Sequence, residues 1–323
     1  MVTSDIIKNN LNNCITDTSF LNLPGFRKGK VRDSFDLGDQ LVLITTDRQS
    51  AFDRILASVP FKGQVLNQIS AFWFDKTEHI ANNHIISIPD PNVTIAKKCR
   101  VFPVEFTVRG YLTGSTSTSV WPLYSKGIRE VCGCILPDGM VRNQKFDNPV
   151  LTPTTKSDIH DEPISAKEIV SKGIIDQRTW EKLEEIAIEL FKFGTAFAEE
   201  RGLILVDTKY ELGMDENGEI IIVDEIHTPD SSRYWLKESY HSRMKEGLEP
   251  ENIDKEYLRL WFKEHCDPYK DEVLPEATEE LVTELSLRYI KLYEMITGVN
   301  FEIPGDIAVS ERIRRNLEKA VGI

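Results

Sequence analysis

The chain has 323 residues and a formal net charge of −13, from 39 lysines and arginines against 52 aspartates and glutamates. Its content of 41% hydrophobic and 28% charged residues is that of a globular protein and excludes a disordered or fibrous chain. The length predicts two or three lobes, because a single hydrophobic core usually extends over roughly 250–300 residues at most. The acidic balance argues against nucleic-acid or membrane-surface binding, since such a surface repels phosphate, and no apolar run is long enough to span a bilayer.

Residues 1–106 are rich in strand signals and form the first expected domain, a β-rich lobe. A turn at Gly38-Asp39 separates two strand-like runs. A helix is expected over 66–80, followed by short strands over 86–90 and 99–112.

Residues 107–235 form the second expected domain, of α/β type. Its first part, 119–158, is rich in Gly, Pro, Asp and Asn and is expected to consist of loops. A helix over 176–202 follows, because apolar residues recur at helical spacing until Gly202 ends it. The third domain, 236–323, is a helical segment expected to pack on the second lobe, with helices at 253–265, 276–298 and 310–321.

A strong hairpin is predicted over 203–226. Asn217-Gly218 favours a two-residue loop, because both residues tolerate positive φ. Such a loop places Glu211 directly opposite Asp224 on the neighbouring strand. Strand alternation puts further residues on the same face: Asp207, Lys209, Ile220, Ile222 and Ile226.

Two opposed carboxylates beside isoleucines are unfavourable unless a positive charge lies between them. Lys209 supplies one charge, and a magnesium ion held by Glu211, Asp224 and substrate phosphates would supply the rest. A solvent-exposed strand face whose carboxylates never converge is the alternative, and the hairpin alone does not decide between the two.

The segment KGKVRDSF places Lys28, Lys30 and Arg32 on one strand face around Gly29. Backbone N–H groups and ammonium charges of this kind can cover phosphates. The segment is neither a Walker A loop nor a kinase glycine-rich loop. A solvated basic turn is the alternative hypothesis.

Further polar clusters lie near the ends of predicted strands or in polar loops, where binding residues are common. They are Asp47, Arg48, Ser50 and Asp53; Arg109, Gly114 and Ser115; Lys156, Asp158, His160, Asp161 and Glu162; and Asp230, Ser231, Ser232 and Arg233. A helix start, a flexible linker and an ordinary surface histidine are the structural alternatives. Together, however, the basic, hydroxyl and acidic side chains suggest anionic ligands with Mg²⁺ and hence phosphoryl transfer. His227 is expected to be structural.

Six motifs in this order resemble the phosphoribosylaminoimidazole-succinocarboxamide synthase (SAICAR synthetase) family: GKVRDSF, TTDRQSAFD, FTVRGYLTGS, TKSDIHDEPIS, DTKYELG and DEIHTPDSSRYW. The resemblance covers about residues 25–240. It implies an α+β fold, with a β-rich N-terminal ATP-binding lobe, an α/β lobe similar to ATP-grasp and kinase folds, and a C-terminal helical extension. It also implies a ligase that joins L-aspartate to a carboxyaminoimidazole ribonucleotide with ATP, through an acyl phosphate.

Carried over to this sequence, the resemblance assigns roles to the clusters. ATP would be bound by Gly29, Lys30, Val31, Arg32, Lys209, Glu211 and Asp224. Magnesium would be held by Glu211 and Asp224, and the catalytic residues would be Lys156, Lys209, Glu211 and Asp224. The substrates would be bound by Asp47, Arg48, Ser50, Asp53, Arg109, Gly114, Ser115, His160, Asp161, Asp230, Ser232 and Arg233.

Two other functions are compatible with these residue types: a small-molecule kinase that transfers phosphate and stops, and a non-catalytic nucleotide-binding scaffold. The basic and acidic residues at positions 30, 209, 211 and 224 argue against the scaffold. Five scattered cysteines and the lack of a secretion signal predict a reduced, cytoplasmic protein. The expected partners are ATP, the ribonucleotide and L-aspartate, without nucleic acid or membrane, and the oligomeric state is left open.

Overall fold

The computed structural model describes residues 2–116, 119–156, 162–305 and 307–322. Its chain forms two compact units. Unit 1 comprises Met1–Trp73, His84–Lys98 and Ile253–Ile323, and unit 2 comprises Phe74–Asn83 and Cys99–Asn252. This grouping differs from three consecutive domains. In particular, from Ile253 onward the C-terminal segment belongs to unit 1, which corrects the expectation that it packs on the second lobe.

The sheet of unit 1 has four antiparallel strands in the order β1-β2-β6-β5. These are β1 (Arg32–Asp36), β2 (Gln40–Thr45), β5 (Ile85–Asp90) and β6 (Val93–Lys97). Gly38 has a φ of 105° in the tight turn between β1 and β2, so the predicted hairpin is confirmed. A small hairpin of β3 (Arg48–Ala51) and β4 (Arg54–Ser58) follows.

The C-terminal helix explains why the end of the chain joins unit 1. Helix α9 (Val309–Val321) packs Val309, Ile313 and Leu317 into the same core as Phe35 and Ile44 of the sheet. Its apolar residues recur at helical spacing, so one face is buried while the rest of the helix is exposed. The other helices with most or all of their residues in this unit are α1 (Ser4–Asn9), η1 (Ser19–Leu21), α2 (Lys62–Lys76), α7 (Glu256–His265) and α8 (Glu279–Thr297).

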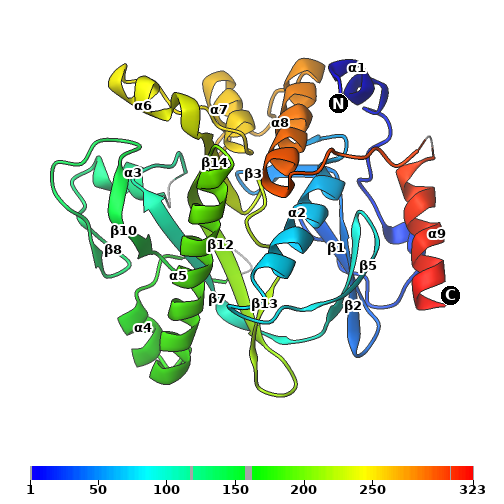
Figure 1. Cartoon of the computed structure of the whole chain (residues 1–323), viewed down its shortest axis with the longest axis horizontal. Coiled ribbons are helices and arrows are strands. Elements are labelled where there is room, and N and C mark those ends of the chain that lie inside the picture. The colour runs from blue at the N-terminus through cyan, green and yellow to red at the C-terminus, as the bar shows by residue number, and fades with distance from the viewer. Residues whose placement is uncertain (1, 117–118, 157–161, 306, 323) are drawn as a thin grey trace. The chain divides into compact units, whose positions relative to one another are not determined.

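Unit 2 is built on the strand order β10-β7-β12-β13, with β11 added to β7 and β14 added to β12. The strands are β7 (Arg100–Tyr111), β10 (Lys145–Leu151), β11 (Thr154–Thr155), β12 (Leu203–Met214), β13 (Ile220–Val223) and β14 (Ser232–Leu236). The long central pair β7–β12 is antiparallel. Helix α5 (Gln177–Glu200) lies along this pair (Figure 1) and buries the apolar stripe that the sequence predicted.

Short elements occupy the stretch that was expected to consist of loops. They are α3 (Val120–Tyr124), β8 (Glu130–Val131) and β9 (Cys134–Ile135), and both β10 and β11 begin before residue 158. The remaining helices are α4 (Ala166–Ser171) and α6 (Lys237–Lys245). None of the helices in the described residues combines the length and apolar composition that a membrane crossing requires.

The hairpin β12–β13 is present, but its predicted register is wrong. Glu211 lies opposite Val223, not Asp224. The reason is the loop, which has five residues because the Asp215 side chain accepts hydrogen bonds from the backbone N–H groups of Asn217 and Glu219, both at 2.9 Å. A loop of five residues in place of two has an odd length, which moves the partner of Glu211 by one residue and places Val223 and Ile221 on the face of Glu211.

A buried carboxylate, Asp47, fixes the start of α2. It accepts hydrogen bonds from the backbone N–H groups of Ile15 at 2.7 Å and Gly63 at 2.8 Å. We predict that Asp47→Ala lowers the free energy of unfolding by roughly 2–4 kcal/mol, because two buried N–H groups lose their acceptor. Urea denaturation checks this prediction, and an unchanged midpoint would contradict it.

The same measurement has a pH dependence. Burial raises the pKa of Asp47 from 3.8 to about 6, so the folded protein holds this proton more tightly than the unfolded chain. The stabilisation is full below the unfolded value and falls as the pH rises toward 6. The advantage of wild type over Asp47→Asn should therefore shrink as the pH rises from about 4 to about 6 and stay constant at higher pH.

Candidate active site

Acidic residues face each other across the central strands of unit 2. Glu105 of β7 lies directly opposite Glu211 of β12. The ammonium group of Lys209 donates hydrogen bonds to both, at 2.8 Å to Glu105 and 2.5 Å to Glu211. Lys156 forms an ion pair with the other carboxylate oxygen of Glu211. The opposed acids that the sequence predicted therefore exist, but the partner of Glu211 is Glu105.

The charges in this cluster stabilise one another. Burial alone would raise the pKa of Glu211, but Lys209 and Lys156 outweigh burial and lower it to about 2. Burial likewise opposes the charge of Lys209, yet Glu211, Glu105 and Asp224 together raise its pKa above the usual range. Three acidic residues therefore act on Lys209: Glu211 and Glu105 through direct hydrogen bonds, and Asp224 through its charge.

Asp224 is the first residue after β13 and has a φ of 64°, which is uncommon for a residue other than glycine. The segment that follows is fixed by His227, which is fully buried and has a φ of 52°. The His227 ring lies 2.5 Å from the Tyr210 hydroxyl, and its carbonyl accepts a hydrogen bond from Tyr234 at 2.8 Å. Burial lowers the pKa of His227 to about 3, so the ring is neutral, which agrees with the structural role predicted for it.

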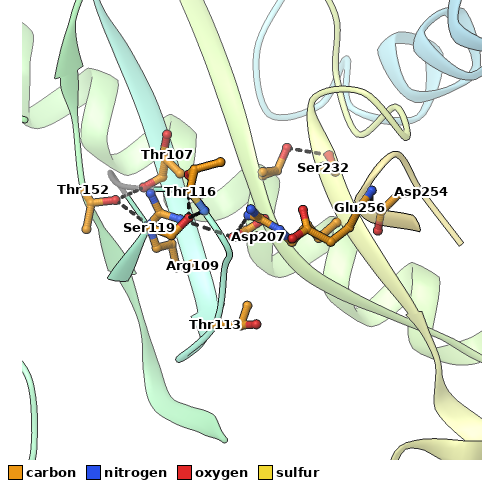
Figure 2. A network of polar contacts seen from close by, with 12 residues as sticks. Thr107, Arg109, Thr113, Thr116, Ser119, Thr152, Asp207, Ser232, Asp254 and Glu256 are labelled. Atoms are coloured by element: carbon orange, nitrogen blue, oxygen red, sulfur yellow. Dashed lines mark hydrogen bonds and ion pairs between the residues drawn. The ribbon is translucent and has the colours of Figure 1, made fainter. Parts of the chain in front are cut away.

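Two arginines share one buried carboxylate on the same sheet, and Figure 2 shows the contact between Arg109 and Asp207. Asp207 Oδ2 lies 3.3 Å from Arg109 Nη1 and 2.7 Å from Arg233 Nη1. Arg109 also donates a hydrogen bond from Nε to Thr152 at 2.8 Å. Burial lowers the pKa of Arg109, and Asp207 partly offsets this. Guanidinium groups held in place by a buried carboxylate present planar N–H donors, and donors of this kind suit an anionic ligand.

A glycine lets the loop after β7 lie close to this arginine pair. Gly114 has a φ of 108°, and a Cβ atom there would stand 2.3 Å from the Ser119 side chain and 3.5 Å from Arg233 Nη2. The Ser119 hydroxyl is also 2.7 Å from that of Thr116. Ser115 therefore directly follows a glycine that lies close to Arg233.

The residues after the second hairpin strand are also gathered in unit 2. Ser232 is buried and donates a hydrogen bond to the Thr208 hydroxyl at 2.8 Å. Asp230 is buried, and its backbone N–H donates to Thr228 at 3.2 Å. The cluster predicted around 230–233 thus adjoins β12, next to the Asp207 that binds both arginines.

The basic loop of unit 1 is shaped from beneath by Arg48. This buried arginine pairs with Asp33 at 2.5 Å and donates to the carbonyl oxygens of Gly29 at 2.9 Å and Lys30 at 3.2 Å. A Cβ on Gly29 would stand 2.2 Å from the carbonyl oxygen of Arg32, so only glycine fits the loop. Arg48 is therefore a support for the loop.

The exposed face of this loop carries Lys30, which pairs with Asp53 while both side chains remain more than half exposed. Val31 contributes its carbonyl oxygen to Thr46, at 3.0 Å from the backbone N–H. Arg32 Nε donates to the Thr45 hydroxyl at 3.1 Å. Ser50, like Asp47, is buried. Of this predicted set, Lys30 and Asp53 carry the exposed charges, whereas Arg32 is partly buried.

Sequence reasoning missed Glu105 and Asp33, and it placed Asp207 on the right strand face without assigning it a role. The available signal for Glu105 was a lone acid inside the apolar strand 99–112. His160 and Asp161 lie outside the described residues. Within the described ranges, no group of three or more His, Cys, Asp or Glu side chains is arranged to hold a metal ion unaided.

Comparisons with known proteins agree on one family. A family model described as SAICAR synthetase matches residues 25–276. A phosphoribosylaminoimidazole-succinocarboxamide synthase of Legionella pneumophila (strain Paris) is 59% identical over 314 residues, which is 96% of this chain and 99% of the relative. The chloroplastic enzyme of that name from Arabidopsis thaliana is 58% identical over 320 residues, 98% of this chain and 78% of the relative.

Solved structures give the same result. The SAICAR synthase of Saccharomyces cerevisiae complexed with SAICAR has a TM-score of 0.78 and 31% identity, over 90% of this chain and all (100%) of the other. A SAICAR synthetase in complex with ADP has a TM-score of 0.66 and 25% identity, over 86% of this chain and 100% of the other. The α+β fold expected from the sequence is confirmed by these neighbours.

Asp207 should matter more for stability than any exposed acid of unit 2. We predict that Asp207→Asn lowers the free energy of unfolding by about 3 kcal/mol, because two buried guanidinium groups lose their counter-charge. The matched control is Asp138→Asn, whose exposed ion pair with Arg129 should contribute less than about 1 kcal/mol. Equal effects of the two substitutions in urea denaturation would contradict the central position of Asp207.

Proposed function

The chain belongs to the SAICAR synthetase family, and we propose that two clusters of unit 2 divide the reaction: the acids and lysines around Lys209 serve the ATP phosphates, and the pair Arg109–Arg233 serves the ribonucleotide. The protein is an ATP-dependent ligase of purine biosynthesis. It joins L-aspartate to the carboxylate of 5-amino-1-(5-phospho-D-ribosyl)imidazole-4-carboxylate and releases SAICAR, ADP and phosphate.

One observation supports this division most directly: both clusters lie on one face of the antiparallel pair β7–β12. Alternate residues of a strand share a face, so Glu105 and Arg109 of β7 stand together with Asp207 and Glu211 of β12. Four residues of strand span roughly 13 Å. A ribonucleotide whose phosphate binds the arginines can therefore extend its carboxylate toward the lysines.

Magnesium is the cation that we propose for the acidic cluster. The chemistry of the donors fits, because Glu211 and Asp224 offer hard carboxylate oxygens and the cluster has one carboxylate more than it has ammonium groups. Mg²⁺ is usually held by one or two carboxylates together with substrate phosphates, which agrees with the lack of a three-residue site among the described residues. When bound, this ion would neutralise the charge of the nucleotide phosphates.

The residues of the chain can perform the remaining work by position and charge. We propose that Lys209 and Lys156 reduce the repulsion between the substrate carboxylate and the γ-phosphate, so that a carboxylate oxygen attacks phosphorus and ADP leaves. The aspartate amine then attacks the carbonyl carbon of the acyl phosphate. Phosphate leaves, the nitrogen loses a proton and the amide forms.

In unit 1, we propose that the loop Gly29–Arg32 binds nucleotide phosphates through Lys30 and its backbone N–H groups. The support from Arg48 fixes the loop before the nucleotide arrives, which reduces the entropy lost on binding. A cytoplasmic location is part of the same proposal, since all five cysteines are free thiols.

A small-molecule kinase is the second candidate, and phosphate release separates it from the ligase. We expect free phosphate to appear in proportion to SAICAR only when ATP, the ribonucleotide and L-aspartate are all present. A phosphate assay coupled with chromatography of the product checks this. Transfer of phosphate to the ribonucleotide with no dependence on aspartate would favour the kinase.

The acidic cluster is tested by isosteric neutralisation. Glu211→Gln and Asp224→Asn should each lower kcat at least a hundredfold, because the nucleotide charge loses its counter-ion site, while the circular dichroism spectrum stays unchanged. Glu216→Gln, in the exposed loop of the same hairpin, is the control and should leave turnover within twofold of wild type. Near-normal turnover in both test variants would refute the metal assignment.

The two basic sites should separate in binding measurements. Lys30→Ala should weaken ATP binding about tenfold and leave ribonucleotide binding unchanged, whereas Arg109→Lys should do the reverse, because lysine lacks the planar fork that binds a phosphate through two donors. Isothermal titration with each ligand checks this, with the exposed neighbour Lys28→Ala as control. If either variant weakened the binding of ATP and of the ribonucleotide equally, the assignment of one basic site to each ligand would be contradicted.

A further inference from the structure

A cavity of about 480 Å³ in unit 2 is lined by the end of β7, the beginning of β12 and helices α5 and α6. Its floor includes Tyr111, Ile204, Tyr240 and Met244. None of these residues takes part in the reaction described above. The volume lies within the range of small-molecule sites, which are mostly apolar inside and carry a few polar groups.

The aromatic part of the floor is preformed. Tyr111 and Tyr240 meet edge to face with ring centroids 5.8 Å apart, and Trp235 stacks on Tyr240 at 5.6 Å. The Tyr240 hydroxyl donates to the carbonyl oxygen of Asn143 at 2.7 Å, which fixes the ring. A flat ligand ring could pack against these side chains without rearranging them.

The polar groups of the cavity suit a ligand that has an anionic group and a hydrogen-bonding atom. Lys145, Lys237 and Glu199 line its exposed rim, and Lys237 pairs with Glu199 at 2.8 Å. The two lysines exceed the one acid, and His241 stands beside them. Deeper in, the Thr195 hydroxyl oxygen is buried and has no hydrogen-bond partner among the described residues, which is uncommon for a buried polar atom.

We propose that this cavity is an effector site for a small aromatic anion. The planar ring packs against Tyr111 and Tyr240, the carboxylate or phosphate binds Lys145, and a polar atom of the ligand bonds the Thr195 hydroxyl. The protein has a net charge of −13, so its surface as a whole repels anions. The positive charge at this rim would therefore bind anions in preference to the rest of the surface.

The cavity is coupled to the arginine pair through two strands. Tyr111 stands two residues after Arg109 on β7, and Trp235 stands two residues after Arg233 on β14. Tyr111 and Trp235 contact each other at 5.1 Å between ring centroids. A ligand seated on Tyr111 therefore presses on both strands and changes the affinity of the arginine pair for the ribonucleotide. This consequence rests on the proposed function, whereas the binding site itself does not.

The first test is isothermal titration of the full chain with indole-3-acetate and, separately, uridine 5′-monophosphate. A saturating non-hydrolysable ATP analogue blocks the nucleotide site. We expect one of the probes to bind, which distinguishes a carboxylate from a phosphate ligand, and Lys145→Glu to weaken it at least tenfold. Met244→Trp, which fills the cavity, should abolish binding. The control Lys126→Glu makes the same charge change at an exposed lysine of unit 2 that does not line the cavity and should have no effect.

The second test is the dissociation constant of the ribonucleotide, which a saturating probe should change at least threefold in wild type and not in Met244→Trp. The effector site is refuted if neither probe binds, or if Lys145→Glu and Lys126→Glu bind the probe equally. Binding of the probe with an unchanged ribonucleotide constant would refute the coupling. If the wild-type protein shows no ligase activity, the proposed function is refuted, but the result of the first test still decides whether the cavity binds the probe.

Discussion

The structure of unit 2 depends on one electrostatic constraint: two glutamates face each other across its central strands. Like charges at directly opposed positions destabilise a sheet. Glu105 and Glu211 are tolerated because the ammonium group of Lys209 bonds both of them. The same arrangement that lets the strands pair concentrates charge at one place on the sheet. We propose that a site for a highly charged ligand follows from how the sheet is held together.

In the arginine pair the charges have the opposite signs: one carboxylate holds two guanidinium groups together. Asp207 is the buried carboxylate that allows Arg109 and Arg233 to lie side by side. Neutralising Asp207 or the arginines would leave a buried charge without its counter-charge, which destabilises the folded state. Strand periodicity then places this positive cluster and the acidic cluster on one face, so that a single substrate with an anion at each end can reach both. We propose that specificity for a ribonucleotide that carries a carboxylate depends on this spacing of alternate residues.

Much of the fold could be predicted from local patterns in the sequence. The turn at Gly38, the stripe of α5 and the C-terminal helices are set by residues close in sequence, and the structure has them. The register of β12–β13 could not be predicted in this way. It depended on whether Asp215 would use its side chain to bond Asn217 and Glu219, which lengthened the loop. The resulting shift of one position changed the partner of Glu211.

The site residues show the same difference between local patterns, which the sequence reveals, and distant contacts, which it does not. Their types and clustering were visible in the sequence, but the roles of Asp47 and Arg48 depended on partners distant in the chain. Asp47 bonds the backbone of Ile15, and Arg48 bonds Asp33 and the loop at Gly29. No local pattern reveals such contacts. Two residues predicted to touch a ligand are thus supports of the fold, and Glu105 was missed because its partner on β12 is about a hundred residues away.

The most direct test of the central claim is a crystal structure of the protein with ADP and Mn²⁺, in which anomalous scattering locates the metal. The account predicts that the metal binds carboxylate oxygens of Glu211 and Asp224 together with the nucleotide phosphates. It also predicts that Lys209 stays bonded to Glu105. A metal and phosphates bound away from these two acids would contradict it.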